Sequence, residues 1–248
     1  MTKQRRVLIV VENLSVPFDR RVWQESRALV DDGYEVHVIC PTGTKRDTER
    51  EVELEGVHIH RYPLTPATGG PIGFVKEYGL ALFHSLKIGL RHGLRRKFDV
   101  VHICNPPDLL FLVALPLKLR GAEVLFDHHD LVPELFRSRF EGGAKLLLKG
   151  TEIAERLTFA TSDAVISTNE SYRQVALTRG KKSEDEVTVV RSAPDLARFE
   201  MADPEPALKQ GKDFLACYLG VMGPQDGIDY ALRSIAHLRH DVGRTDLH

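Results

Sequence analysis

Short apolar runs alternate with helical patterns along most of this chain, and this alternation restricts the fold more than any other feature. Apolar strands are predicted at 5–11, 35–39, 99–104, 123–126, 163–167 and 187–190. Helical patterns separate them, so successive strands run parallel and the helices cover both faces of the sheet. We therefore expect an α/β fold with a doubly wound, Rossmann-like parallel sheet.

Several local patterns refine this expectation. Residues 52–54 and 57–62 flank Glu55-Gly56, which predicts a hairpin or a strand extension. Pro17 suits the first turn of a helix, whereas Pro133 is expected to block a helix directly after the strand at 123–126. One long helix is predicted over 74–97. Its expected core stripe consists of Val75, Tyr78, Leu82, Leu86 and Leu90, and its basic stripe of Lys87, Arg91 and Arg95.

The pattern changes near residue 191, where prolines and mixed charges replace the apolar periodicity. We expect an N-terminal domain at 1–196, a linker at 197–212, and the start of a second domain at 213–248. A strand at 214–219 and a helical stripe from Ile228 to Leu238 predict its first βα unit. One strand and one helix cannot form a core, so we infer that the chain is truncated inside a second Rossmann-like domain.

Composition excludes some classes of protein. The 34 Lys and Arg residues nearly balance the 35 Asp and Glu residues. The chain therefore lacks the excess of basic residues that is typical of nucleic-acid-binding proteins. Three distant cysteines have no metal-binding spacing and are expected to be buried free thiols. The apolar run Val7–Val11 is too short for a signal peptide or a membrane span, so a cytoplasmic protein is expected.

Candidate site residues follow the strand at 123–126, where Asp127-His128-His129-Asp130 stand at its carboxyl end. Ligands bind at that end in open α/β sheets. Adjacent histidines on an extended segment point opposite ways, and no second His/Asp cluster is evident, which argues against a metallohydrolase. The same reasoning on sheet edges selects Asp130 of this group and five further residues, although each can equally cap a helix or lie in solvent: Arg20, Arg21, Asn105, Glu134 and Glu170.

Three stretches resemble the retaining GT-B glycosyltransferases of family four, especially the bacterial branch that builds surface polysaccharides. They are VLIVVENLSVPFDRRVWQESRALVDDGYEVHVICP, DHHDLVPELF and YLGVMGPQDGID. The resemblance implies transfer of a sugar from a nucleotide-sugar donor to a glycan or lipid-linked acceptor, with retention of configuration. It also implies that no metal or other cofactor is required.

The resemblance assigns roles to particular residues. His129, paired with Asp130, would lie against the donor sugar and orient it. For Arg20 and Arg21, their place at the sheet edge, rather than the resemblance, suggests contact with acceptor or phosphate. Gly220 and Gly223 would let the backbone approach the donor diphosphate, and Gln225 would add a side-chain donor.

This chain also departs from the family pattern. Val221 and Asp226 stand where the family has an Arg and a Lys, and Ser192-Ala193 replaces its Asn-Gly hinge. The two glutamates that hold the nucleotide sugar in the family would lie beyond residue 248. We therefore expect the 248-residue chain alone to have little transferase activity.

Two other functions remain open from the residues alone. A sugar-nucleotide epimerase of the same architecture would need an acid/base pair, which His128 or His129 could form with Glu134. A non-catalytic module would use the helix at 74–97 to bind a partner or an anionic membrane surface, which for a cytoplasmic protein is the inner membrane face.

Overall fold

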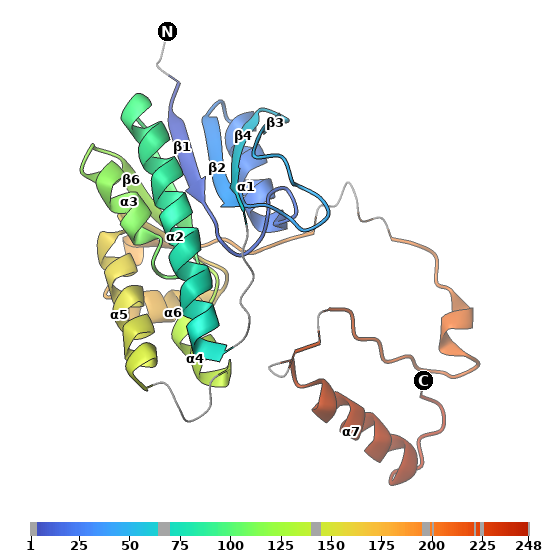
Figure 1. The fold of residues 1–248 in the computed structure, drawn as a ribbon. Helices are drawn as coiled ribbons and strands as arrows, with labels where there is room; N and C mark the ends of the chain where they lie inside the picture. Colours follow the sequence, from blue (N-terminus) through green and yellow to red (C-terminus); the bar gives the residue numbers. More distant parts are fainter. Residues whose placement is uncertain are drawn as a thin grey trace. The chain divides into compact units, whose positions relative to one another are not determined.

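Eight strands form one sheet in the order β3-β4-β2-β1-β5-β6-β7-β8 (Figure 1). The strands are β1 (Arg6–Val10), β2 (Glu35–Pro41), β3 (Glu51–Leu54), β4 (Val57–Tyr62), β5 (Val100–Cys104), β6 (Glu123–His128), β7 (Ala164–Ser167) and β8 (Val187–Val189). All neighbouring strands pair in parallel except β3 and β4, which form an antiparallel hairpin. The predicted α/β fold and the hairpin are confirmed.

This structure, a computed structural model, describes residues 4–63, 70–139, 145–194, 199, 201–220, 222–223 and 226–247. Its α-helices are α1 (Arg20–Asp31), α2 (Gly70–Arg95), α3 (Phe111–Lys118), α4 (Val132–Arg139), α5 (Lys145–Thr161), α6 (Glu170–Thr178) and α7 (Ile228–His240). Short 3-10 helices lie at Glu184–Glu186 and Pro206–Lys209. The chain divides into two compact units, Met1–Ser192 and Ala193–His248. Among the described helices, none combines the length and apolar character needed to cross a bilayer.

The apolar sequence of β1 follows from its central place in the sheet. Leu8 and Val10 enter one core cluster, together with residues of α2, α3, α5 and α6. Val7 and Ile9 enter a second cluster on the opposite face, beside Val22 of α1. Because helices cover both faces, every residue from Val7 to Val10 is buried, which is typical of parallel sheets.

Two proline expectations were wrong. Helix α1 begins at Arg20, because the Asp19 side chain caps it by accepting a hydrogen bond from the Val22 N–H at 3.1 Å. Pro17 therefore precedes the helix. Helix α4 begins at Val132, so Pro133 lies in its first turn, where a missing N–H removes no helical hydrogen bond.

The buried side of α2 also differs from the predicted stripe. Val75 is exposed, and Tyr78, Leu82, Leu86 and Leu90 are only half-buried. The buried positions that the structure describes on this helix carry small residues: Gly73, Ala81, Ser85, Gly89 and Gly93. A Cβ on Gly93 would lie 2.2 Å from Cδ2 of Leu117 in α3. The close approach of two helices, rather than hydrophobicity alone, therefore selects the residues of this face.

The second unit contains α7 but not the expected strand at 214–219. Phe214 forms only an isolated bridge with Leu247, and every described side chain of this unit is exposed or half-exposed. A strand needs a paired neighbour to satisfy its backbone N–H and C=O groups, and this segment has only that single bridge among the described residues.

Candidate active site

A buried carboxylate, Asp127, organises the carboxyl edge of the sheet. Its side chain has no exposed surface, and Arg21 of α1 binds it through two hydrogen bonds, Nε to Oδ2 at 2.7 Å and Nη2 to Oδ1 at 2.8 Å. The Nη1 group of Arg21 donates to the carbonyl of Val190 at 3.0 Å and to Oγ of Ser192 at 3.3 Å. All three nitrogens of Arg21 thus bind groups of the first unit. This favours a positioning role over direct contact with acceptor or phosphate.

His129 is the second member of this network. Its Nδ1 lies 3.1 Å from Oδ2 of Asp127, and its side chain is 16% exposed. Burial favours the neutral imidazole, but the hydrogen bond to Asp127 and the charge of that carboxylate outweigh burial and raise the pKa of His129. Burial likewise opposes ionisation of Asp127, yet the hydrogen bonds from His129 and Arg21 lower its pKa. Donation from Nδ1 leaves Nε2 of His129 to interact with a ligand.

Asn105 fixes the backbone that carries His129. This buried amide follows β5, and its Oδ1 accepts hydrogen bonds from the N–H groups of His129 and Asp130 at 3.0 and 3.1 Å. Its Nδ2 donates to the Asp130 carbonyl at 2.6 Å and to Oδ1 of Asp108 at 3.0 Å. Asn105 and His129 therefore lie together at one edge, as predicted, and Asn105 acts by holding the turn.

His128 points the other way, as expected for neighbours on an extended segment. It is completely buried, and its ring centroid lies 5.5 Å from that of Phe126 and 5.1 Å from that of Phe159. Burial lowers the pKa of His128 to about 4, so this imidazole is neutral at pH 7. A substrate cannot reach it, which removes His128 from the acid/base pair considered for an epimerase.

The remaining predicted residues of the first unit have other partners. The Glu134 carboxylate accepts two hydrogen bonds from Arg179, at 2.7 and 3.2 Å. Burial is outweighed by these bonds, and the pKa of Glu134 is lowered. Glu170, in the first turn of α6, accepts from Arg173 and Gln174 at 3.1 Å each. Arg20 is exposed at the first position of α1.

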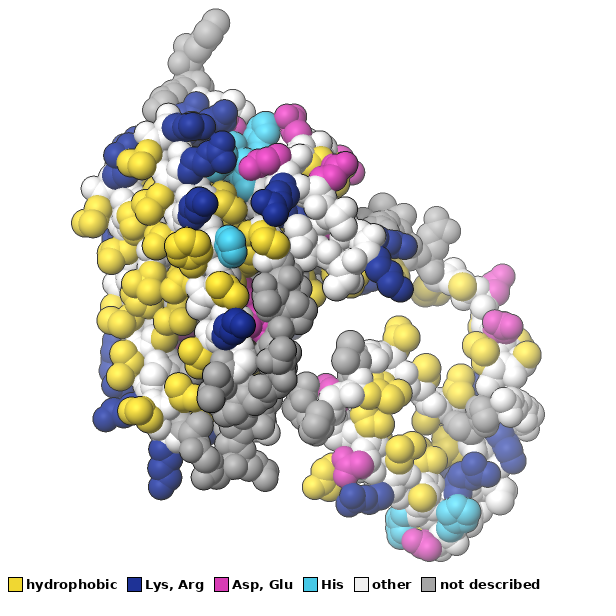
Figure 2. All heavy atoms as spheres, viewed as in Figure 1, with side chains coloured by type: hydrophobic (Ala, Val, Ile, Leu, Met, Phe, Trp, Pro, Cys, Tyr) yellow, Lys and Arg dark blue, Asp and Glu magenta, His cyan; other side chains and the backbone are white. Residues whose placement is uncertain are grey.

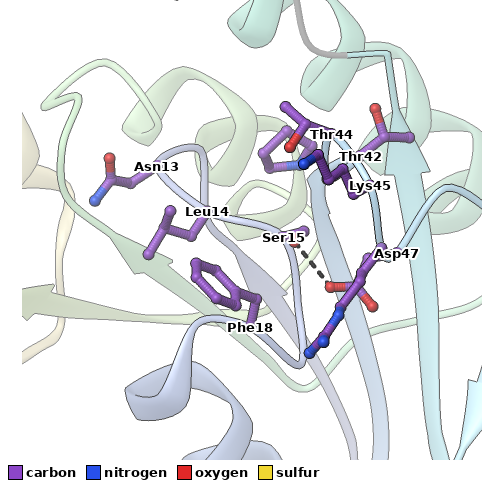
Figure 3. Close-up of a pocket in the computed structure, with 11 residues that line it drawn as sticks. Asn13, Leu14, Ser15, Phe18, Thr42, Thr44, Lys45 and Asp47 are labelled. Atoms are coloured by element: carbon purple, nitrogen blue, oxygen red, sulfur yellow. Dashed lines mark hydrogen bonds between the residues drawn. The ribbon is translucent and has the colours of Figure 1, made fainter.

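Two cavities open at the carboxyl edge. The first, about 310 Å³, lies between the loops that follow β1 and β2 (Figure 3). Phe18 projects into it, and a hydrogen bond of 2.9 Å from Oγ of Ser15 to Oδ2 of Asp47 joins the two loops. The second, about 220 Å³, is lined by Asp130, Tyr78 and residues of α4. Asn13 lines both cavities, so they are neighbours along this edge.

Sequence reasoning missed several of these residues. Glu12 lies two residues after the end of β1 and is 4% exposed, and burial, followed by the charge of Glu77, raises its pKa to about 8. Glu25 lies 3.3 Å from Nε of Arg21, and burial and the charge of Asp127 raise its pKa to about 8. The position of Glu12 after an apolar strand was an available signal. The i,i+4 spacing of Arg21 and Glu25 within α1 was also visible in the sequence, but the proximity of Asp127, which belongs to β6, was not.

In the second unit, one backbone N–H of the predicted phosphate-binding loop already donates a hydrogen bond to a side chain of the same loop. The N–H of Gly223 donates to Oδ2 of Asp226 at 2.7 Å, and a Cβ on Gly220 would lie 3.1 Å from the Tyr218 hydroxyl. Gln225 lies outside the described residues. A phosphate at Gly223 would have to replace the Asp226 carboxylate.

Solved structures share this fold at low sequence identity. Sucrose-phosphate synthase from Thermosynechococcus elongatus superposes with a TM-score of 0.70 at 13% identity, over 95% of this chain and 60% of the synthase chain. The catalytic domain of starch synthase IV from Arabidopsis thaliana, bound to ADP and acarbose, gives 0.60 at 14% identity, over 94% and 66%. A putative UDP-N-acetylglucosamine 2-epimerase from Listeria monocytogenes gives 0.59 at 14% identity, over 99% and 62%.

These likenesses establish the GT-B type of fold, and the chain spans about 60% of the length of the synthase. No curated protein matches the chain. The profile of the glycosyl transferase 4-like domain matches residues 19–193, which include α1, β6 and the network around Asp127. Because this match covers more than half of the sequence, the chain belongs to the glycosyl transferase 4-like domain family.

Proposed function

We propose that this chain forms the acceptor-side part of a retaining glycosyltransferase that uses a nucleotide-sugar donor and a glycan or lipid-linked acceptor. The observation that carries the proposal is the placement of His129 on the rim of a parallel sheet, hydrogen-bonded to the buried Asp127. The family match supports glycosyl transfer, and the ADP in the starch synthase IV structure supports a nucleotide-sugar donor.

In this proposal His129 orients the donor sugar. The raised pKa keeps the imidazole protonated to a higher pH than usual, so Nε2–H donates a hydrogen bond to a sugar hydroxyl while Nδ1–H donates to Asp127. In this role His129 positions the sugar and does not act as the base. The acceptor oxygen forms its bond to the anomeric carbon on the face from which the diphosphate leaves, and the departing diphosphate takes the proton of the acceptor hydroxyl, so the configuration is retained.

The first cavity suits a carbohydrate acceptor. It presents polar side chains from Asn13, Ser15, Thr42 and Lys45, which can bind sugar hydroxyls (Figure 3). Phe18, 65% exposed, offers a flat apolar surface to the face of a sugar ring. Gly220, Gly223 and Gln225 remain our proposal for binding the donor diphosphate.

A lipid-linked acceptor fits the exposed side of α2. Phe83 and Leu94 are 60% and 67% exposed, and exposed basic residues at positions 87, 91 and 95 share that helix. Figure 2 shows hydrophobic and basic side chains together on this face. Each basic side chain near an anionic leaflet contributes about 1 kcal/mol. We propose that this surface contacts the membrane that carries the acceptor.

Sugar transfer is tested with the complete protein that contains this sequence. Replacing His129 with Ala should lower kcat by about 100-fold or more, because one preorganised hydrogen-bond donor contributes that much to many transition states. Replacing the exposed His237 of α7 with Ala serves as the matched control. NMR of the product determines its anomeric configuration. An unchanged rate for H129A, or an inverted product, would contradict the proposal.

Incubation with a nucleotide sugar and no acceptor distinguishes an epimerase, which would change the donor itself. The structure counts against that function, because His128 is buried and Glu134 is held by Arg179.

Co-sedimentation with anionic vesicles tests the membrane surface. Binding that disappears at high salt is expected, and equal binding to neutral vesicles would refute the electrostatic part.

A further inference from the structure

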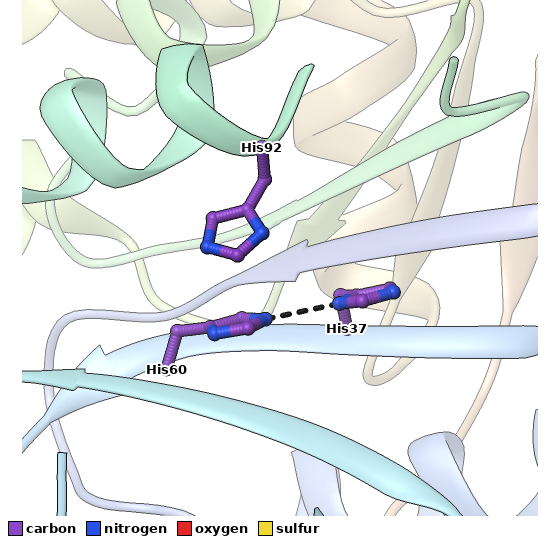
Figure 4. Close-up of side chains that lie close together, drawn as sticks. All are labelled: His37, His60 and His92. Carbon is purple, nitrogen blue, oxygen red and sulfur yellow. Dashed lines mark hydrogen bonds between the residues drawn. The ribbon is translucent and has the colours of Figure 1, made fainter. Parts of the chain in front are cut away.

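On the face of the sheet beside α2, the structure gathers histidines from β2, β4 and α2. His37 of β2 and His58 of β4 are register partners, and His60 lies two positions further along the same face of β4. Helix α2 places His92 over them, and Figure 4 shows its ring directed toward those of His37 and His60. The expectation that the chain has no second histidine cluster was therefore wrong. The sequence did not reveal this cluster because its members are separated by up to 55 residues.

The distances among His37, His60 and His92 suit a metal ion. Nδ1 of His37 lies 2.9 Å from Nε2 of His60, and the ring centroids of His60 and His92 are 4.1 Å apart. One nitrogen from each of the three rings lies within 4.8 Å of the other two. Two nitrogens bound to one tetrahedral Zn²⁺ at about 2.0–2.1 Å are about 3.4 Å apart. Small side-chain rotations therefore bring all three nitrogens to one ion.

Carboxylates occupy the outer nitrogens of two of these rings. Nε2 of His37 lies 3.1 Å from Oε1 of Glu35, and Nδ1 of His60 contacts Oε2 of Glu51. Arg6 and Arg96 hold the Glu35 carboxylate at 2.7 and 2.6 Å. Metal-binding histidines usually donate their second N–H to such a carboxylate, which directs the remaining lone pair at the ion.

Counting hydrogens shows why an ion fits here. Three contacts form a chain: Glu51 with His60, His60 with His37, and His37 with Glu35. Each of them needs one hydrogen atom between its two partners. Two neutral imidazoles supply only two. A cation between the inner nitrogens removes the shortage, because both N–H groups then donate outward.

We propose that His37, His60 and His92 bind one divalent late transition-metal ion of the Zn²⁺ type, with Glu35 and Glu51 as outer partners and water completing the coordination. Three imidazoles are suited to such ions. His92 is half-exposed, and Figure 2 shows histidine atoms at the surface among acidic and basic side chains, so an ion can enter. The ion would join α2 to β2 and β4 and thereby stabilise the first unit.

The test is calorimetric titration of the metal-free 248-residue chain with ZnCl₂ near neutral pH, together with its thermal unfolding. The parent should bind one Zn²⁺ at this site and gain thermal stability. Replacing His92 with Gln should weaken binding at least about tenfold, since even outer-shell changes cost about 10- to 100-fold. The matched control is His84→Gln, eight residues earlier on α2, where the ring stacks on Tyr62 instead.

Equal Zn²⁺ binding by H92Q and H84Q would assign the ion to other histidines and overturn the proposal. Absence of binding by the parent would do the same. Imidazole ¹⁵N NMR gives a second readout. A protonated His37 or His60 in the presence of excess Zn²⁺ would show that a proton, not a metal, joins the two rings.

Discussion

The pair formed by Arg21 and Asp127 allows a quantitative prediction for Arg21→Met. Methionine fills a similar volume but leaves the Asp127 carboxylate, which has no exposed surface, without its two hydrogen bonds from the guanidinium. Removing one partner of a buried ion pair costs about 3–5 kcal/mol, because the other charge stays buried. His129 still contacts Asp127 at 3.1 Å and offsets part of the loss. We therefore expect a cost near the lower end, about 3 kcal/mol.

Urea unfolding at pH 7, followed by circular dichroism, measures this cost. The matched control is Arg27→Met on the same helix, where the arginine pairs with the exposed Glu55 and Asp31. Exposed pairs contribute at most about 1 kcal/mol. The double variant Arg21→Met/Asp127→Asn removes both charges. Its loss of stability should be smaller than the sum of the losses in the two single variants, by at least about 1 kcal/mol.

The pH dependence gives a separate check of the sign. The pKa of Asp127 in the folded protein is below its ordinary value of 3.8, so the stability that the ion pair contributes is present above that pH and is lost as pH falls further. Without Arg21 the pKa of Asp127 rises, and the buried charge is neutralised on acidification. The difference between parent and R21M should therefore shrink at low pH. A loss below about 1 kcal/mol at pH 7, or additive single effects, would refute this account of the ion pair.

Two further predictions concern packing and burial. Gly93→Ala should destabilise the protein by about 1–3 kcal/mol, because its Cβ would meet the buried Leu117. The control is Gly79→Ala on the same helix, whose Cβ meets nothing within 4 Å and which should stabilise the protein by about 0.5–1 kcal/mol. Equal effects of the two substitutions in thermal melts would contradict the close contact between the helices. Because the pKa of His128 is lowered from 6.5 to about 4, its contribution favours folding fully above pH 6.5 and is lost as pH falls toward 4. His128→Leu should flatten the decline of stability over that range in urea titrations, and an unchanged slope would show that His128 is not buried as a neutral ring.

The parallel sheet was predictable because its strands carry their own signal. A strand covered on both faces must be apolar throughout, as Val7 to Val10 are, and it is short enough to be recognised locally. The rim position of His129 and the opposite direction of His128 followed from the alternation of side chains along a strand. These inferences needed only neighbours in sequence.

Features that depend on distant residues could not be predicted in this way. The small residues on the buried side of α2 reflect the approach of α3, which no periodicity in α2 alone reveals. The function of Arg21 depends on Asp127, which is 106 residues away, and sequence position alone suggested a ligand contact. The strand expected at 214–219 had a suitable apolar pattern, yet a strand is stable only when another strand pairs with it.

The Nη1 group of Arg21 contacts the last residues of the first unit, at Val190 and Ser192, while its other nitrogens hold Asp127. One planar guanidinium group therefore links the last residues of this unit to the carboxylate that holds His129. A shift of residues 190–192 would pull on the guanidinium and tilt the imidazole through the carboxylate between them. We therefore expect movement of the chain at this junction to change the orientation of His129 through these hydrogen bonds.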